Sequence, residues 1–182
     1  MSDTRFHATR AGLVGMMVMF LAACGGSVQG QPSTSGPTGS PRSSGDLIDG
    51  VDPCKLLSAD QLQKAGLGGQ GKPVDGALET GCEYSNQDFA ARVYKNKTKN
   101  LAEYEKAQHA FDEFEPNQVN GHPGARVVAR GSKGNGGCTQ VLDLGKGSVA
   151  VEIGYNYGKY QGKDPCADAM AIAKLVEPNL PK

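Results

Sequence analysis

Apolar positions along the second half of the chain alternate with polar or small ones in two neighbouring runs. The first run is "CTQVLDL" (138–144) and the second is "SVAVEIGYNY" (148–157). The intervening Gly145-Lys146-Gly147 is typical of a hairpin turn. A period of two predicts a pair of antiparallel strands. Shorter runs predict three more strands, at "GCEYSN" (81–86), "FAARVYK" (89–95) and "ARVVAR" (125–130).

Three other segments have the spacing of helices. In 52–66, Asp52-Pro53 is a helix-start signal, and Ser58 with Gln61 is an alternative start through a capping box. The segment 100–114, "NLAEYEKAQHAFDEF", has apolar residues on one helical face and precedes Pro116. The last segment, 164–178, begins at a second Asp-Pro pair and predicts a helix with one apolar face. Helices and strands in this order predict an α+β domain, with an antiparallel sheet covered by helices on one side.

The N-terminus has the organisation of a secretory signal. Arg5 and Arg10 precede the apolar stretch "AGLVGMMVMFLAAC" (11–24), which is shorter than the roughly 20 residues of a membrane-spanning helix. Its end, "LAAC", resembles the bacterial lipobox, which predicts a signal peptide over 1–23 and a lipid anchor (diacylglycerol and palmitate) on Cys24. The alternative is an ordinary signal peptide with an incidental cysteine.

Between the anchor and the globular part, residues 24–45 are rich in Gly, Ser and Pro. Such a composition buries too little apolar surface to fold, so we expect a flexible tether. Residues 46–182 then have the length of one extracytoplasmic domain. The chain has 19 basic and 19 acidic side chains, and this balance gives no electrostatic reason to expect a nucleic-acid partner.

Four cysteines remain in the domain: Cys54, Cys82, Cys138 and Cys166. An even number in an exported chain predicts disulfides, with three connectivities open. Cys54 with Cys82 and Cys138 with Cys166 are each 28 residues apart, and we expect these two pairs. The alternative is a reactive thiol at Cys54 or Cys166, because each lies in the first turn of a predicted helix.

Several spaced motifs together resemble a known family. They are "DPCKLLSADQL" after the lipobox and tether, "GCEYS", "GHPGARV", "GGCTQVLDLGKG" and "DPCADAMAIAKLVEPNLP". In this order they resemble an actinobacterial (mycobacterial Lpr-type) lipoprotein family catalogued as a domain of unknown function. The resemblance covers the mature domain. It implies a cell-envelope lipoprotein and assigns no catalytic residue.

Candidate ligand-binding residues are few. Tyr155, Tyr157 and Tyr160 ("GYNYGKYQG") form a candidate ligand surface together with Lys133, which lies in the glycine-rich "GSKGNGGC". That loop lacks the order of a phosphate-binding loop, so a plain connection between strands is the alternative.

The residue types of catalytic and metal sites are sparse. We expect no metal and no cofactor, because neither His109 nor His122 has a local partner for catalysis or metal ligation. The acidic cluster 112–115 lacks the spacing of a calcium loop.

The sequence therefore predicts a lipoprotein on the extracytoplasmic face of the cell membrane. Its domain is expected to bind an envelope protein, a glycan or a lipid without catalysing a reaction. One alternative is a sensor or accessory subunit of an envelope complex. Another is an enzyme, either a hydrolase or a thiol oxidoreductase.

Overall fold

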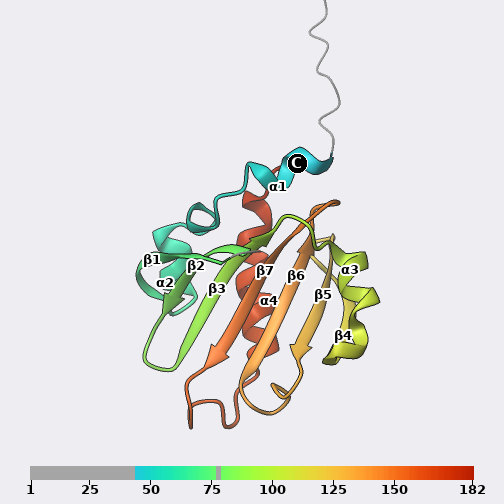
Figure 1. Cartoon of the computed structure of the whole chain (residues 1–182). Helices are drawn as coiled ribbons and strands as arrows, with labels where there is room; N and C mark the ends of the chain where they lie inside the picture. The colour runs from blue at the N-terminus through green and yellow to red at the C-terminus, as the bar shows by residue number, and fades with distance from the viewer. Residues whose placement is uncertain (1–43, 77–78) are drawn as a thin grey trace, which may run out of the picture. The chain divides into compact units, whose positions relative to one another are not determined.

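Seven antiparallel strands form one sheet in the computed structural model, which describes residues 44–76 and 79–182 (Figure 1). The spatial order is β1-β2-β3-β7-β6-β5-β4, so the middle strand β7 comes from the end of the chain. The strands are β1 (Gly68–Asp75), β2 (Glu79–Ser85), β3 (Phe89–Asn96), β4 (Phe111–Val119), β5 (His122–Ala129), β6 (Gly137–Asp143) and β7 (Ser148–Tyr155).

Four short helices and three 3-10 turns complete the domain. The helices are α1 (Ser44–Asp49), α2 (Ala59–Lys64), α3 (Leu101–Lys106) and α4 (Pro165–Val176). The 3-10 turns are η1 (Pro53–Lys55), η2 (Gln108–Ala110) and η3 (Glu177–Asn179). None of the helices in the described part of the chain combines the length and apolar character that crossing a membrane requires.

The predicted hairpin of β6 and β7 is confirmed at the centre of the sheet. Val149, Val151 and Ile153 are fully buried on one face, as the alternating pattern predicts. Gly145 has φ 80°, a backbone conformation that glycine adopts without strain.

Helices α2 and α4 pack on this same face of the sheet, which confirms the predicted α+β arrangement. Figure 1 shows α4 behind β6 and β7. Asp164 caps α4 by accepting hydrogen bonds from two backbone N–H groups of its first turn, and Ile172 and Val176 are buried in the core. The alternative start at Ser58 is also confirmed, since Ser58 and Gln61 form a capping box on α2.

The predicted long helix over 100–114 is wrong in its second half. The helix ends at Lys106, and residues 111–119 form the edge strand β4 paired with β5. Phe111 and Phe114 do pack beside Tyr104, but on the opposite face of the sheet from α4, in a small cluster with Val127. Apolar spacing alone could not distinguish these arrangements, because pairing with β5 is a long-range interaction. Pro116 lies within the edge strand, where a missing N–H donor is tolerated.

Candidate functional site

A groove of about 450 Å³ lies on the helical face of the sheet, beside the first turn of α4. Strands β4 and β5 form one wall, and the loops before β6 and before α4 form the others. Charged side chains and one tyrosine contribute much of its lining: Glu113, Arg126, Lys133, Lys163, Asp164 and Tyr160. A volume of this size is within the range of about 300–1,000 Å³ that is usual for small-molecule sites.

A second depression of about 230 Å³ continues the groove along α4. Arg126, Asp164 and Cys166 line both parts, so the two spaces adjoin. The floor of the second part includes Asn117 and the buried Gln140. Together the two parts make an elongated polar surface.

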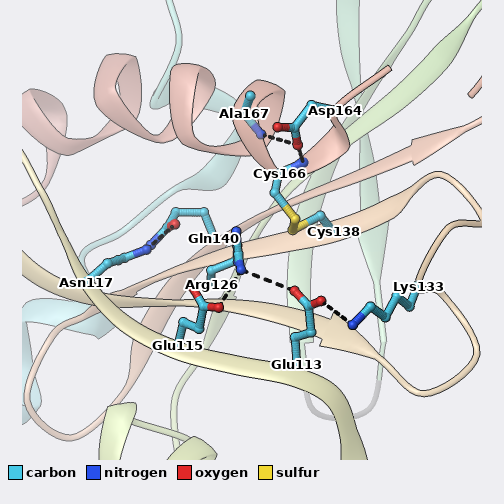
Figure 2. A network of polar contacts seen from close by, with 10 residues as sticks. All are labelled: Glu113, Glu115, Asn117, Arg126, Lys133, Cys138, Gln140, Asp164, Cys166 and Ala167. Atoms are coloured by element: carbon cyan, nitrogen blue, oxygen red, sulfur yellow. Dashed lines mark hydrogen bonds and ion pairs between the residues drawn. A yellow bond between two sulfur atoms is a disulfide. The ribbon is translucent and has the colours of Figure 1, made fainter. Parts of the chain in front are cut away.

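An alternating chain of charges crosses the groove (Figure 2). Lys133 Nζ lies 2.8 Å from Glu113 Oε1, and Arg126 Nη2 lies 3.2 Å from Glu113 Oε2 and 2.6 Å from Glu115 Oε1. The strand pattern explains this arrangement: Glu113 and Glu115 are two residues apart on β4 and share a face, and Glu115 is directly opposite Arg126 on β5.

These contacts perturb the ionisation of Glu113 and Lys133. The hydrogen bond from Lys133, with the nearby charges of Lys133 and Arg126, lowers the pKa of the Glu113 carboxyl. The same hydrogen bond, together with the negative charge of Glu113, raises the pKa of Lys133. Both side chains therefore remain charged and paired at neutral pH.

The glycine-rich loop holds a carboxylate of the protein itself. Gly131 N–H donates to Asp112 Oδ2 at 2.7 Å, and Lys133 N–H donates to the same oxygen at 3.4 Å. Gly131 and Gly134 have positive φ, which lets the loop turn in this way. The loop thus has the anion-cradling geometry considered above, but Asp112 occupies it and Glu113 neutralises the Lys133 side chain.

The structure brings together two of the four residues predicted as a ligand surface. Tyr160 and Lys133 line the same groove. Gly136 lies against Tyr160, because a Cβ atom on Gly136 would come within 2.7 Å of Tyr160 Cβ. Tyr157, in contrast, is 97% exposed and outside the lining of the groove.

The remaining tyrosine, Tyr155, is directed toward α4. Its hydroxyl donates to Asp168 Oδ2 at 2.5 Å, and its ring lies 5.3 Å from the Phe89 ring. Burial and the hydrogen bond to Asp168 raise the pKa of Tyr155 to about 12. Tyr155 therefore supports the packing of α4.

Both expected disulfides are confirmed, Cys54–Cys82 and Cys138–Cys166. The second joins β6 to the first turn of α4, and Cys166 contributes to both parts of the groove. The thiols of these four cysteines are therefore used as cross-links. Cys24, the predicted lipidation site, lies outside the described residues.

His109 and His122 lie apart from the groove. His109 is exposed, and His122 Nε2 hydrogen-bonds to the backbone carbonyl of Asp143 in a separate pocket of about 330 Å³. In residues 44–76 and 79–182 there is no cluster of three or more His, Cys, Asp or Glu side chains suited to a metal ion.

Sequence reasoning missed Arg126, Glu113 and Gln140 as groove residues. A signal was present at Arg126, because both faces of its strand are buried: Ala125 and Val127 on one face and Val128 on the other. A charged residue at an inward position indicates a polar site.

The fold and groove define an α+β domain with an antiparallel seven-stranded sheet and a polar cleft beside its C-terminal helix. The family model described as Protein of unknown function (DUF3558) matches residues 19–179, and the chain belongs to this family. Searches of curated proteins and of solved structures found no match.

Proposed function

We propose that the protein is a cell-envelope lipoprotein, anchored in the membrane through a lipidated Cys24, whose domain binds a ligand or partner without catalysis. The groove beside α4 is the observation that carries the binding role. It is a preformed polar cleft in which fixed charges and one tyrosine converge. Convergent polar groups in a cleft of this size are typical of ligand recognition.

The anchored location is supported by the sequence. "LAAC" at 21–24 matches the lipobox pattern, and the resemblance to actinobacterial Lpr-type lipoproteins has the same implication. Two acyl chains provide stable anchoring, since each buried CH₂ contributes about 0.8 kcal/mol. A coil of about 21 residues would then hold the domain on the order of 25 Å from the anchor.

The chemistry around the groove supports binding over catalysis. Cys166, the nearest cysteine, is in a disulfide, and Glu113 and Lys133 stabilise each other in their charged forms. A general base or acid instead needs a pKa near the working pH.

A fatty-acid labelling experiment tests the anchor. Cells expressing the wild-type chain are expected to incorporate radioactive palmitate into it, whereas the Cys24→Ala chain should not be labelled. Equal labelling of both chains would refute lipidation at Cys24.

A photo-crosslinking experiment tests the binding role of the groove. Lys163 lines the groove, while Lys159 lies on the same loop and pairs with Asp88 instead. A benzoylphenylalanine at position 163 is expected to give a light-dependent mass increase of the chain in intact cells, and the same residue at 159 should not. Equal adducts from both positions, or none from 163, would contradict binding in the groove.

A further inference from the structure

The groove beside α4 has no excess charge, although charged side chains form much of its wall. Lys133, Arg126 and Lys163 supply positive charge, and Glu113, Asp164 and the neighbouring Glu115 supply an equal negative charge. Such a balance gives neither a strongly anionic nor a strongly cationic ligand an electrostatic advantage.

Lys133, Glu113, Arg126 and Glu115 are also already paired with one another. An anion would have to displace Glu113 or Glu115 from Arg126, or Asp112 from the N–H groups of the loop. A cation would have to replace Lys133 at Glu113. Displacing one member of such a pair leaves its partner without its counter-charge, which disfavours either kind of ion, modestly because these side chains are partly exposed.

Polar capacity nevertheless remains for a neutral ligand. An ammonium has three donors and a guanidinium has five, so Lys133 and Arg126 keep donors beyond their contacts with glutamates. The carboxylates of Glu113 and Glu115 likewise keep acceptor sites. A hydroxyl group both donates and accepts, and therefore can bond to both kinds of group without disturbing the pairs.

Tyr160 adds an aromatic ring to this polar wall. Gly134, Gly136 and Gly137 line the groove beside it. Tyrosine combines an apolar ring with a polar hydroxyl, a combination suited to a ligand with an apolar ring face and hydroxyl edges. At Gly134 a Cβ would meet nothing within 4 Å, so a ligand can approach the backbone closely there. Sugar rings have this character.

We propose that the groove binds a neutral oligosaccharide, with Tyr160 against a sugar ring and the chain of Lys133, Glu113, Arg126 and Glu115 bonded to its hydroxyls. This proposal rests on the binding function proposed above and specifies its ligand class. The continuation of the groove along α4 favours several linked sugars over a single one.

Saturation-transfer NMR on the full chain, in micelles of a detergent without a sugar headgroup, tests this ligand class. The probes are neutral hexasaccharides of glucose, mannose, galactose and N-acetylglucosamine, with inorganic phosphate as a charged competitor. We expect saturation transfer to the ring protons of at least one hexasaccharide, and no displacement by phosphate.

Two tyrosine variants provide the matched comparison. Tyr160→Ala should weaken the observed affinity by about three- to tenfold, because one aromatic contact is lost. Tyr157→Ala should leave it unchanged, since Tyr157 lies outside the lining of the groove. Tyr160→Leu, which keeps an apolar side chain over Gly136, should also weaken binding and serves if Tyr160→Ala does not fold.

Three results would overturn the proposal: no transfer to any of the four hexasaccharides, displacement by phosphate, or binding that is insensitive to Tyr160→Leu. Crosslinking from position 163 without sugar binding would refute the oligosaccharide and leave a different ligand in the groove. Failure of both experiments would refute the binding function as well.

Discussion

Asn117 and Gln140 exchange two hydrogen bonds across the intervening strand β5 (Figure 2). Asn117 Nδ2 donates to Gln140 Oε1 at 3.0 Å, and Gln140 Nε2 donates to Asn117 Oδ1 at 2.8 Å. Gly124 lies between them, and its lack of a side chain leaves room for the pair to meet. The floor of the groove therefore depends on a satisfied polar pair and on one glycine.

Breaking this amide pair from one side should destabilise the domain. Asn117→Ala leaves Gln140, which is 2% exposed, with a buried acceptor that has lost its partner. We expect the free energy of unfolding to fall by about 1–3 kcal/mol in urea denaturation. The control is the double variant Asn117→Ala with Gln140→Met, which removes both partners and should recover part of the loss.

Gly124→Ala should be still less tolerated. A Cβ atom at this position would lie 2.2 Å from the backbone oxygen of Val141, and a strand backbone cannot move away easily. Overpacking of this kind costs about 1–3 kcal/mol, and we expect the upper end in thermal unfolding. Gly154, around which a Cβ would meet nothing within 4 Å, is the matched site, and Gly154→Ala should change stability little.

Removing the hydroxyl of Tyr84 should stabilise the domain, in contrast to the substitutions at Asn117 and Gly124. Tyr84 is 3% exposed, and its buried hydroxyl has no hydrogen-bond partner within residues 44–76 and 79–182. Tyr84→Phe is therefore expected to raise the free energy of unfolding, by about 1 kcal/mol. Tyr155→Phe is the comparison, because it loses the bond to Asp168 and should lower stability. A decrease for both variants would contradict the assignment at Tyr84.

The bond between Tyr155 and Asp168 also predicts a pH dependence. The pKa of the Tyr155 hydroxyl is raised from 10 to about 12 in the folded state. The stabilisation from its bond to Asp168 is therefore complete below pH 10 and is lost as the pH rises through 12. Burial also raises the pKa of Tyr84, Tyr94 and Tyr104, so ultraviolet titration of tyrosinate should show several late-ionising phenols, and Tyr155→Phe should have one fewer than the wild type. An unchanged number of late-ionising phenols in that variant would contradict the shift at Tyr155.

The fold was largely predictable because its main signals are local. The alternation in 148–157 specifies β7, and the Asp-Pro start with inward Ile172 and Val176 specifies α4. The equal 28-residue separation of the two cysteine pairs was enough to predict the disulfide connectivity once export was inferred. In contrast, β1 (Gly68–Asp75) contains three glycines and a proline, and it forms a strand only through its pairing with β2.

The candidate site was less predictable because it depends on contacts between distant elements. Lys133 and Tyr160 were identified from residue type alone. Their partners Glu113 and Arg126 were missed, since residues 111–114 were assigned to a helix and strand pairing across β4 and β5 creates the contact. The occupant of the anion-cradling loop could not be predicted either, because Asp112 belongs to β4 whereas the loop follows β5.

Cleavage before Cys24 and lipidation of Cys24 both change the mass of the chain, so the decisive measurement is the intact mass of the protein extracted from the membrane fraction. We predict a mature chain that begins at Cys24, carries the added mass of a diacylglycerol, and retains both disulfides until it is reduced. A chain recovered without acyl mass would refute lipidation of Cys24, and a chain cut at a position other than the bond before Cys24 would refute the lipoprotein signal.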